Sequence, residues 1–294
     1  MGFLEIRGIS KAFDAAGTRR EVLRGVTLSI ERGDFVSIVG MMGCGKSTLL
    51  KIAGGLLDAD SGSVAIEGKA VTAATGIRRD AAFVFQNYSL LPWFSALENV
   101  RLAVGAAFPD WSKDRQREQA ARHLAAVGLG QALHRRPGQL SGGMRQRVAI
   151  ARAFAIEPGI LFLDEPFGAL DALTRESLQQ ELMRLRSAAE RSVTTLMITN
   201  SVDEALLLSD RVVPMTGRPS SLGAAVAIEL ARPRSADQLL HDERAAHVRS
   251  RVVSSLTDDL ARDRRFGRPA ADSARRDPSR SVVRTIVAGA EGEG

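Results

Sequence analysis

The chain has 294 residues, of which 45% are hydrophobic and 25% charged, and a formal net charge of +6. This size and composition predict a globular protein with room for two subdomains. No uninterrupted apolar run approaches about 18 residues and no cleavable signal peptide is recognisable, so we expect that the chain cannot itself cross a membrane. A single cysteine excludes an intrachain disulfide, which suits a reducing compartment.

A glycine-rich loop follows the strand-rich sequence of residues 3–39. Residues 34–39 are a short β-branched run typical of a buried strand, and residues 47–53 have helical character. The order strand, G-x-x-x-x-G-K-S, helix is the context of a phosphate-binding loop, in which glycines allow backbone N–H groups to surround phosphates. The residues predicted to bind nucleotide here are Gly40, Gly43, Cys44, Gly45, Lys46, Ser47 and Thr48.

Two of these side chains have predicted roles of their own, and a third has two interpretations. Lys46 is expected to reach the β- and γ-phosphates, and the Ser47 hydroxyl to bind magnesium. Cys44 is either a small residue that fits the loop or a thiol whose thiolate is favoured by the helix N-terminus.

The next part of the chain changes from strand-like to helical patterns. Residues 60–86 predict short strands around Gly62 and Gly76, and residues 87–157 are mostly helical, most clearly 114–127. Aromatic residues are scarce in this chain, at 5%, so a cluster directly after Gln86 stands out. It consists of Tyr88, Leu90, Leu91, Trp93 and Phe94.

A second candidate anion site lies at the start of the helical segment 144–155. Ser141 is a plausible helix N-cap, and Gly142 and Gly143 expose backbone donors where the helix dipole is positive. One chain already has its own phosphate loop, so this second site has no obvious ligand in the same chain. A head-to-tail dimer resolves this, with each nucleotide between one chain's phosphate loop and the other chain's residues 141–143.

Two carboxylates follow a second buried strand, residues 160–163. Ligands bind at the carboxyl ends of strands in open α/β sheets, so Asp164 is expected to hold magnesium through water. Glu165 is expected to accept a proton from the attacking water or to orient it. From residue 159 onward strands alternate with helices, which predicts a parallel sheet. Asp171 can cap the helix predicted over 172–189.

The three segments in this order resemble the ATP-binding subunits of ABC transporters, over about residues 3–230. The resemblance implies an α/β P-loop NTPase core with a mixed sheet, made of residues 1–86 and 158–230. It also implies an inserted α-helical signature subdomain at 87–157. Residues 231–294 form a basic tail, in which 241–259 could be helical and the part from Arg262 is expected to be disordered and solvated.

The resemblance assigns further site residues. It implies that Phe13 stacks on adenine, although Phe13 could be ordinary core. Gln86 corresponds to the glutamine that senses magnesium and the attacking water, although it could simply end a strand. Asp171 corresponds to the residue that couples the two sites across the dimer, the alternative being the helix cap alone. The implied cofactors are ATP and Mg²⁺.

Several short segments indicate which group of ABC transporters this chain resembles most. Residues 86–93, 140–147 and 202–205 are similar to those of importers of nitrate, bicarbonate, sulfonates and taurine, and 197–205 with 213–217 are most similar to the nitrate/bicarbonate branch. The expected function is therefore that of an ATPase subunit of a small-oxyanion importer, nitrate first. Expected partners are a second ATPase chain, integral membrane permease subunits and, indirectly, an extracytoplasmic solute-binding protein, with no nucleic acid. The expected location is the cytoplasmic face of the membrane.

The aromatic cluster after Gln86 is then expected to form a groove for a cytoplasmic helix of the permease. Alternatively, Trp93 belongs to the core of the helical subdomain, and both interpretations can be partly true.

One residue departs from the family pattern. ABC ATPases usually carry a histidine after the strand 195–199, where this chain has Asn200. An amide can donate a hydrogen bond to the γ-phosphate but cannot carry charge or a proton. Either the site is slow or half of an asymmetric pair, or Asn200 is an accepted variant and Glu165 supplies the chemistry.

Other classes share part of this pattern. A nucleic-acid ATPase of the repair type needs a long coiled coil between Lys46 and Ser141, for which the separation is too short, and translation-type members usually carry two cassettes. An exporter or lipid-handling ATPase shares every catalytic motif. A catalytically inactive regulatory partner is suggested by Asn200 alone.

Overall fold

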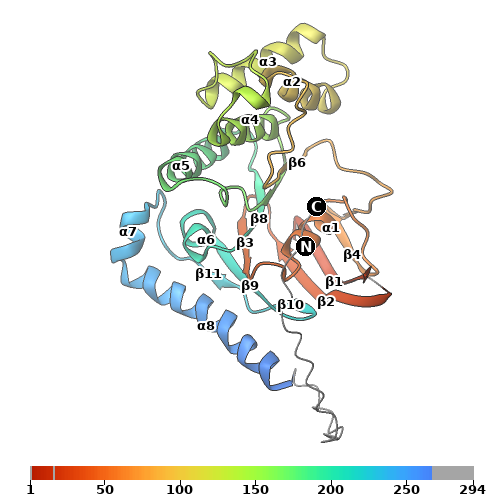
Figure 1. Cartoon of the computed structure of the whole chain (residues 1–294), viewed down its shortest axis with the longest axis vertical. Helices are drawn as coiled ribbons and strands as arrows, with labels where there is room; N and C mark the ends of the chain where they lie inside the picture. Colours follow the sequence, from red (N-terminus) through yellow and green to blue (C-terminus); the bar gives the residue numbers. More distant parts are fainter. Residues whose placement is uncertain (1, 16, 267–294) are drawn as a thin grey trace, which may run out of the picture.

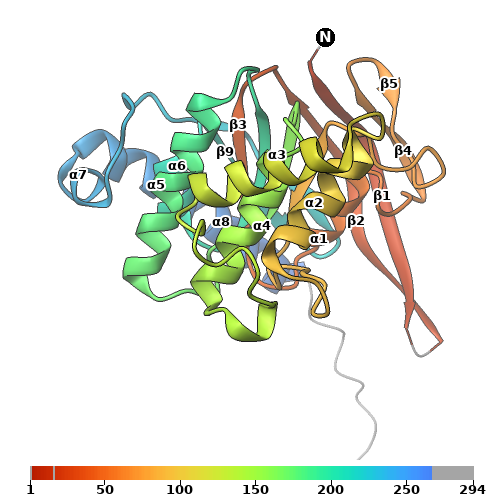
Figure 2. The same cartoon turned by 90° about the horizontal axis from the view of Figure 1, so that it is seen from above.

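A computed structural model describes residues 2–15 and 17–266. These residues form one eleven-stranded mixed sheet covered by helices, which confirms the predicted fold class (Figures 1 and 2). The strands are β1 Leu4–Ala15, β2 Thr18–Ile30, β3 Phe35–Gly40, β4 Ser61–Ile66, β5 Lys69–Ala70, β6 Ala81–Val84, β7 Ile160–Asp164, β8 Thr194–Thr199, β9 Arg211–Gly217, β10 Ser220–Leu222 and β11 Val226–Ala227. The helices are α1 Lys46–Ala53, α2 Ala96–Ala107, α3 Lys113–Ala126, η1 Pro137–Gln139, α4 Gly142–Phe154, α5 Ala172–Ala188, α6 Val202–Leu208, α7 Ala236–His241 and α8 Glu243–Phe266.

The sheet has a parallel block and an antiparallel block. Strands β9, β3, β8, β7 and β6 are neighbours in that order and run parallel, as the alternating pattern after residue 159 predicted. Strands β5, β4, β1 and β2 pair antiparallel. The short strand β10 joins the blocks, because it pairs parallel with β2 and antiparallel with β9.

The central strands are apolar and buried because helices cover both faces of the sheet. All six residues of β3 are buried, as expected for a central parallel strand. On one face, α1 places Leu49, Leu50 and Ile52 in a core shared with the antiparallel block and with β7 and β8. On the other face, α2 to α5 share a core with β6 and β7. In Figure 2 the antiparallel strands β1, β2, β4 and β5 lie to one side of the helices α2 to α5.

The helical segment between β6 and β7 projects from one end of the molecule (Figure 1). Its first helix is stabilised by a capping box, in which Ser95 and Glu98 exchange hydrogen bonds with each other's backbone. Its buried residues, such as Val100 on α2 and Val148 on α4, belong to the same cluster as Val84 on β6. The segment therefore packs onto the sheet through a continuous core.

Two predictions about secondary structure are wrong. The segment around Gly76 forms a turn, with a positive φ of 71° at Gly76, and contains no strand within residues 71–80, all of which are described. In the tail, the helix predicted over 241–259 is present as α8, but the disorder expected from Arg262 is wrong for residues 262–266, where the helix continues. Helix α8 packs Ala245, Val248 and Val252 into a core with α6, β9 and β11. The predicted disorder beyond residue 266 lies outside the described residues.

Tail arginines hold this C-terminal segment in place. Arg234 donates hydrogen bonds to the carbonyls of Leu206 and Ser209, at 2.8 and 2.6 Å, and Arg249 donates to Asp203 at 2.8 Å. Arg234 and Arg249 are therefore used in contacts with α6 and with Ser209, which follows it. Within residues 2–15 and 17–266, the structure has no helix that combines the length and the apolar character needed to span a bilayer.

Candidate functional site

The carboxyl ends of three neighbouring parallel strands meet at one place. Strand β3 leads into the phosphate loop, β7 ends at Asp164, and β8 leads into Asn200, and these strands lie side by side in the order β3, β8, β7. Residues far apart in the sequence are brought together there, as the rule for open α/β sheets predicts. Beside them lies a pocket of about 360 Å³. It is lined by Phe13, Arg20, Glu21, Val22, Gly43, Cys44, Gly45, Lys46, Ser47, Thr48, Glu165, Arg218, Pro219 and Ser220.

The phosphate loop has the backbone that its glycines were predicted to allow. Gly43 and Gly45 have φ angles of 75° and 103°, in the region that disfavours a side chain. Gly40 is needed for a different reason, since a Cβ there would lie 2.6 Å from the carbonyl oxygen of Met215. No side chain caps the start of α1, and residues 43–48 line the pocket, so this helix N-terminus is placed to bind an anion.

Lys46 is the centre of a polar network at the base of the pocket. Its Nζ atom donates to the carbonyl oxygens of Gly40 (2.9 Å) and Met41 (3.0 Å), and to Oδ1 of Asn200 (2.6 Å). The side chain is 3% exposed. A buried ammonium of this kind needs acceptors, and it can exchange them for phosphate oxygens when an anion enters.

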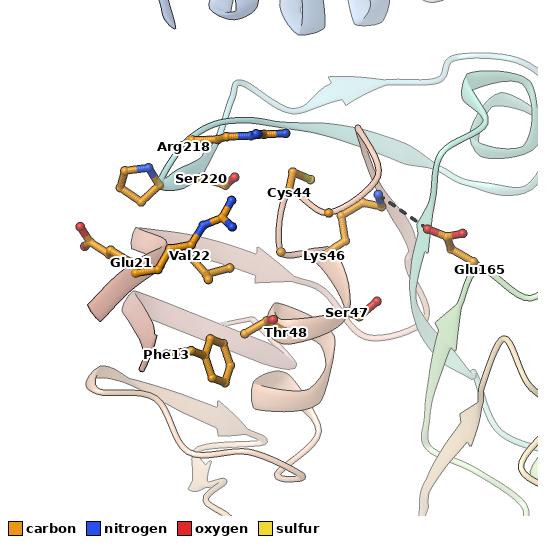
Figure 3. A pocket seen from close by; sticks show the side chains of 14 residues that line it. Phe13, Glu21, Val22, Cys44, Lys46, Ser47, Thr48, Glu165, Arg218 and Ser220 are labelled. Carbon is orange, nitrogen blue, oxygen red and sulfur yellow. Dashed lines mark ion pairs between the residues drawn. The ribbon is translucent and has the colours of Figure 1, made fainter. Parts of the chain in front are cut away.

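Asn200 connects this lysine to the second carboxylate. Its Nδ2 atom donates to Oε1 of Glu165 at 2.8 Å, while its Oδ1 accepts from Lys46. Lys46 and Glu165 are themselves 3.7 Å apart, the ion pair drawn in Figure 3. The amide therefore bridges a cation and a carboxylate, which fixes the position of the Glu165 side chain.

Glu165 also has an unusual backbone. Its φ of 44° lies in the left-handed region, which costs a non-glycine residue about 1–3 kcal/mol and is found mainly at functional sites. Its N–H donates to the carbonyl oxygen of Ile198 on β8 at 3.0 Å, which holds the chain in this conformation. Next to it, the buried Asp164 accepts a hydrogen bond from the Ser47 hydroxyl at 2.9 Å. Ser47 and Asp164 thus form a pair of hard oxygen donors.

The thiolate interpretation of Cys44 is wrong. The side chain is 6% exposed and packs in the apolar core beneath the loop. Burial raises the pKa of the Cys44 thiol, and this outweighs the opposing effects of Lys46 and of the loop backbone. The helix N-terminus does not lower the pKa of the thiol overall, because the sulfur lies in the core. Cys44 still lines the pocket, as the sequence predicted.

Phe13 and Glu165 lie at opposite ends of the pocket (Figure 3). Phe13 is 40% exposed on the hairpin of β1 and β2, so it is not core, and Nζ of Lys11 lies 5.6 Å from its ring centroid. Gln86 follows β6 and is exposed. Its Nε2 and Oε2 of Glu165 both lie close to Gly168, at 3.9 and 3.8 Å from a Cβ built there. The structure thus brings Gln86 to the carboxylate end of the site.

Residues 141–143 are placed differently. Ser141 caps α4 by accepting a hydrogen bond from the N–H of Met144 at 3.2 Å, as predicted. Within the described part of the chain, however, none of the residues 141–143 lines the pocket around the phosphate loop. Asp171 caps α5 by accepting from the N–H of Thr174 at 3.0 Å, and this bond lowers the pKa of its carboxyl. A single chain therefore does not unite all the predicted site residues.

Arg218, which lines the pocket, and Arg152, which binds the loop after Gln86, were not predicted from the sequence. Arg218 reaches the pocket from the turn between β9 and β10 (Figure 3), and adds positive charge beside the phosphate loop. Arg152 on α4 donates to the carbonyl oxygens of Tyr88 (2.8 Å) and Ser89 (2.6 Å). Both of those residues have positive φ, 64° and 46°. For Arg218, the only signal in the sequence is its position directly after the segment 213–217. For Arg152, it is the position on the face of helix α4.

The fold and this pocket define a P-loop NTPase, with a phosphate loop, a paired serine and aspartate, and a positioned glutamate around one cavity. A family model described as ABC transporter matches residues 23–168. The chain is 45% identical over 263 residues to the nitrate import ATP-binding protein NrtD of Synechococcus elongatus, covering 89% of this chain and 94% of that protein. It is 44% identical to the bicarbonate transport ATP-binding protein CmpD of Synechocystis, covering 89% and 91%.

A solved structure agrees with these matches. The chain is similar to the ATP-binding cassette MJ0796, described as dimeric, in a post-hydrolysis state and bound to ADP and Pi. The TM-score is 0.70 at 32% identity, covering 78% of this chain and all of that one. The chain belongs to the ABC transporter family, as an ATP-binding subunit with ATPase function.

Proposed function

We propose that this chain powers an importer of a small oxyanion, with nitrate as the first candidate substrate and bicarbonate or a sulfonate such as taurine as the alternatives. The observation that carries the proposal is the 45% identity to a nitrate import ATP-binding protein over almost the full length of both chains. The network of Lys46, Asn200 and Glu165 supports an active rather than a regulatory site, because each group has the partner it needs.

The roles we propose follow from position. Lys46 and the N–H groups of residues 43–48 bind the phosphates of ATP, and Phe13 offers its exposed ring to adenine at the other end of the pocket. Glu165 receives a proton from the attacking water or orients it, with Asn200 holding the carboxylate in place. Gln86 lies at the same end of the site as Glu165, beside Gly168, and we expect it to contact that water or the metal from there.

The donor set suits magnesium. Mg²⁺ in proteins keeps several waters and uses one or two protein oxygens plus substrate phosphates. The hydroxyl of Ser47 and the carboxylate of Asp164, 2.9 Å apart, fit this requirement, with Gln86 as a third candidate contact. When bound, Mg²⁺ would neutralise developing charge on the phosphates. Ser47 and Asp164 would then exchange their mutual hydrogen bond for contacts with the metal and its waters.

We further propose that the working unit is a head-to-tail dimer. In the single chain, residues 141–143 lie away from the pocket and begin helix α4, whose positive N-terminus supports their use on the nucleotide of a second copy. Asp171 caps the neighbouring helix α5, and from there it can couple the two nucleotide sites of the dimer. The dimeric form of the similar cassette MJ0796 is consistent with this arrangement.

The proposed location is the cytoplasmic face of the membrane, on permease subunits. Trp93 is 63% exposed and contacts Phe94, whereas Tyr88 and Leu90 pack against the subdomain core. The aromatic cluster is therefore divided, and Trp93 is the part available for a permease helix. Trp93→Ala is expected to reduce transport while ATP binding stays unchanged. Equal loss of both would give Trp93 a folding role instead.

The decisive experiment is Mg²⁺-dependent ATPase activity of the complex purified from its native membrane through this chain. Nitrate, bicarbonate and taurine are added in turn, and Glu165→Gln is the control. Stimulation by one anion that the control abolishes supports the importer and identifies its substrate class. A complex without membrane subunits, or one indifferent to all three anions, would contradict the importer proposal.

A further inference from the structure

The two most exposed large apolar side chains lie next to functional segments. Among the large hydrophobic residues of the described chain, Leu173 is 81% exposed and Met42 is 79% exposed, and Met41 beside it is 53% exposed. An isolated exposed apolar side chain is common on protein surfaces. Here, however, one lies next to the helix start of residues 141–143 and the other lies in the phosphate loop.

The position of Leu173 follows from the contact between α4 and α5. A Cβ built on Gly143 would lie 2.6 Å from Cγ2 of Thr174, so the first turns of the two helices touch. Leu173 precedes Thr174 at the start of α5, and its side chain points to solvent. Any molecule that covers residues 141–143 of this chain therefore also comes close to Leu173.

The position of Met42 follows from the phosphate loop. The carbonyl oxygen of Met41 accepts from the buried Lys46 Nζ at 3.0 Å, which fixes the loop backbone. The side chains of Met41 and Met42 project away from this anchored backbone, and neither lines the pocket of the described residues. Whatever closes over the phosphate loop from outside must meet these two methionines.

We propose that Leu173 of one copy packs against Met41 and Met42 of a second copy when the two copies close on ATP. This rests on the proposed head-to-tail dimer, which brings residues 141–143 of one copy onto the phosphate loop of the other. Twofold symmetry makes the contact twice in each dimer. Methionine suits a contact that forms and breaks in each cycle, because its flexible side chain adapts to a partner surface.

The contact contributes to closure rather than to the fold. Leu173 and Met42 touch little in the single chain, so replacing them by serine leaves the monomer folded. Each dimer makes this contact twice, so each serine variant loses two buried side chains and is expected to weaken the ATP-dependent dimer about a hundredfold.

Association is measured by sedimentation on the full chain carrying Glu165→Gln, with ATP and Mg²⁺, so that hydrolysis does not reopen the dimer. Leu173→Ser and Met42→Ser are expected to raise the dimer dissociation constant about a hundredfold each. The double variant is expected to lose little more than either single one, because each change removes the same contact. Leu240→Ser is the matched control, since Leu240 is 69% exposed on α7 and should leave association unchanged.

The outcomes separate this inference from the proposed function. If the Glu165→Gln chain forms no dimer with ATP, the proposed dimer itself fails. If it dimerises and both serine variants associate like Leu240→Ser, the apolar contact is refuted while the dimer stands. Additive losses in the double variant would show that the two side chains act in separate contacts. Weaker capture of membrane subunits with unchanged dimerisation would assign this surface to the permease and overturn the proposal.

Discussion

Replacing Asn200 tests the most specific feature of the site, the amide that bridges Lys46 and Glu165. Asn200→Ala removes the hydrogen bond to Glu165 (2.8 Å) and one of the three acceptors of Lys46. Lys46 keeps the carbonyl oxygens of Gly40 and Met41, so phosphate binding should change little. Glu165 has no comparable replacement, and a hydrogen bond to a charged group contributes about 1.5–3 kcal/mol. Because Asn200 is exposed, the lower value applies, which corresponds to a fall in kcat of about tenfold.

Asn200→His is the matched variant. A neutral imidazole offers one donor and one acceptor, so it can make the same bridge, and kcat should stay within about threefold of the wild type. Histidine also titrates near pH 6.5, unlike asparagine. The pH profile of kcat should therefore gain a step in Asn200→His that the wild type lacks.

Steady-state measurements of kcat and KM for ATP hydrolysis test whether Asn200 positions Glu165. A wild-type kcat in Asn200→Ala would refute the positioning role. A large rise in KM at constant kcat would move the role of Asn200 to phosphate binding. If Asn200→His restored activity to an inactive wild type, the interpretation of a slow or asymmetric site would be correct instead.

Three further predictions concern the loop, a buried carboxyl and a buried arginine. Gly45→Ala should weaken ATP binding at least tenfold and cost about 1–3 kcal/mol of stability in urea denaturation, because φ is 103° and the new Cβ would lie 2.7 Å from Val22. Burial raises the pKa of Glu204, so the folded state holds its proton more tightly than the unfolded state, and stability should fall as pH rises from about 4.3 toward the raised value. Urea denaturation between pH 4 and 8 should show this slope in the wild type, and Glu204→Gln should lack that contribution. Arg152→Met should cost about 2 kcal/mol, mainly through the lost bond to the partly buried carbonyl of Tyr88, and Arg152→Lys less; equal stabilities would refute this.

The elements with strong local signals were predictable. Strand β3 with its phosphate loop, the helix α4 that Ser141 caps, and strand β7 ending in Asp164 each have a pattern contained within a few residues. Hydrophobic period, capping and glycine spacing are local properties, and here they agreed with the final fold. The strand predicted around Gly76 is absent because the glycine and β-branched residues there have no neighbouring strand to pair with.

The rest depended on contacts between distant residues. The tail has polar, arginine-rich sequence, yet Arg234 and Arg249 bind α6, and apolar residues at helical spacing hold α8 against the sheet. The pKa of Cys44 depends on whether its sulfur faces the helix dipole or the core, which the motif does not specify. The bridge through Asn200 requires β8 to lie between β3 and β7, and so it follows from strand order rather than from residue type.

The loop after Gln86 can pass a movement at the nucleotide site on to the protein surface. Gln86 lies beside Gly168 at the nucleotide end. Tyr88 and Ser89, which follow it closely, have left-handed conformations and accept hydrogen bonds from Arg152 of α4, the helix that Ser141 caps. Further along, Asn99 donates to and accepts from the backbone of Leu91. A loop fixed at these points cannot absorb a displacement of Gln86 by local bending alone. Such a displacement is therefore expected to move α4 or the exposed end of the loop, where Trp93 lies.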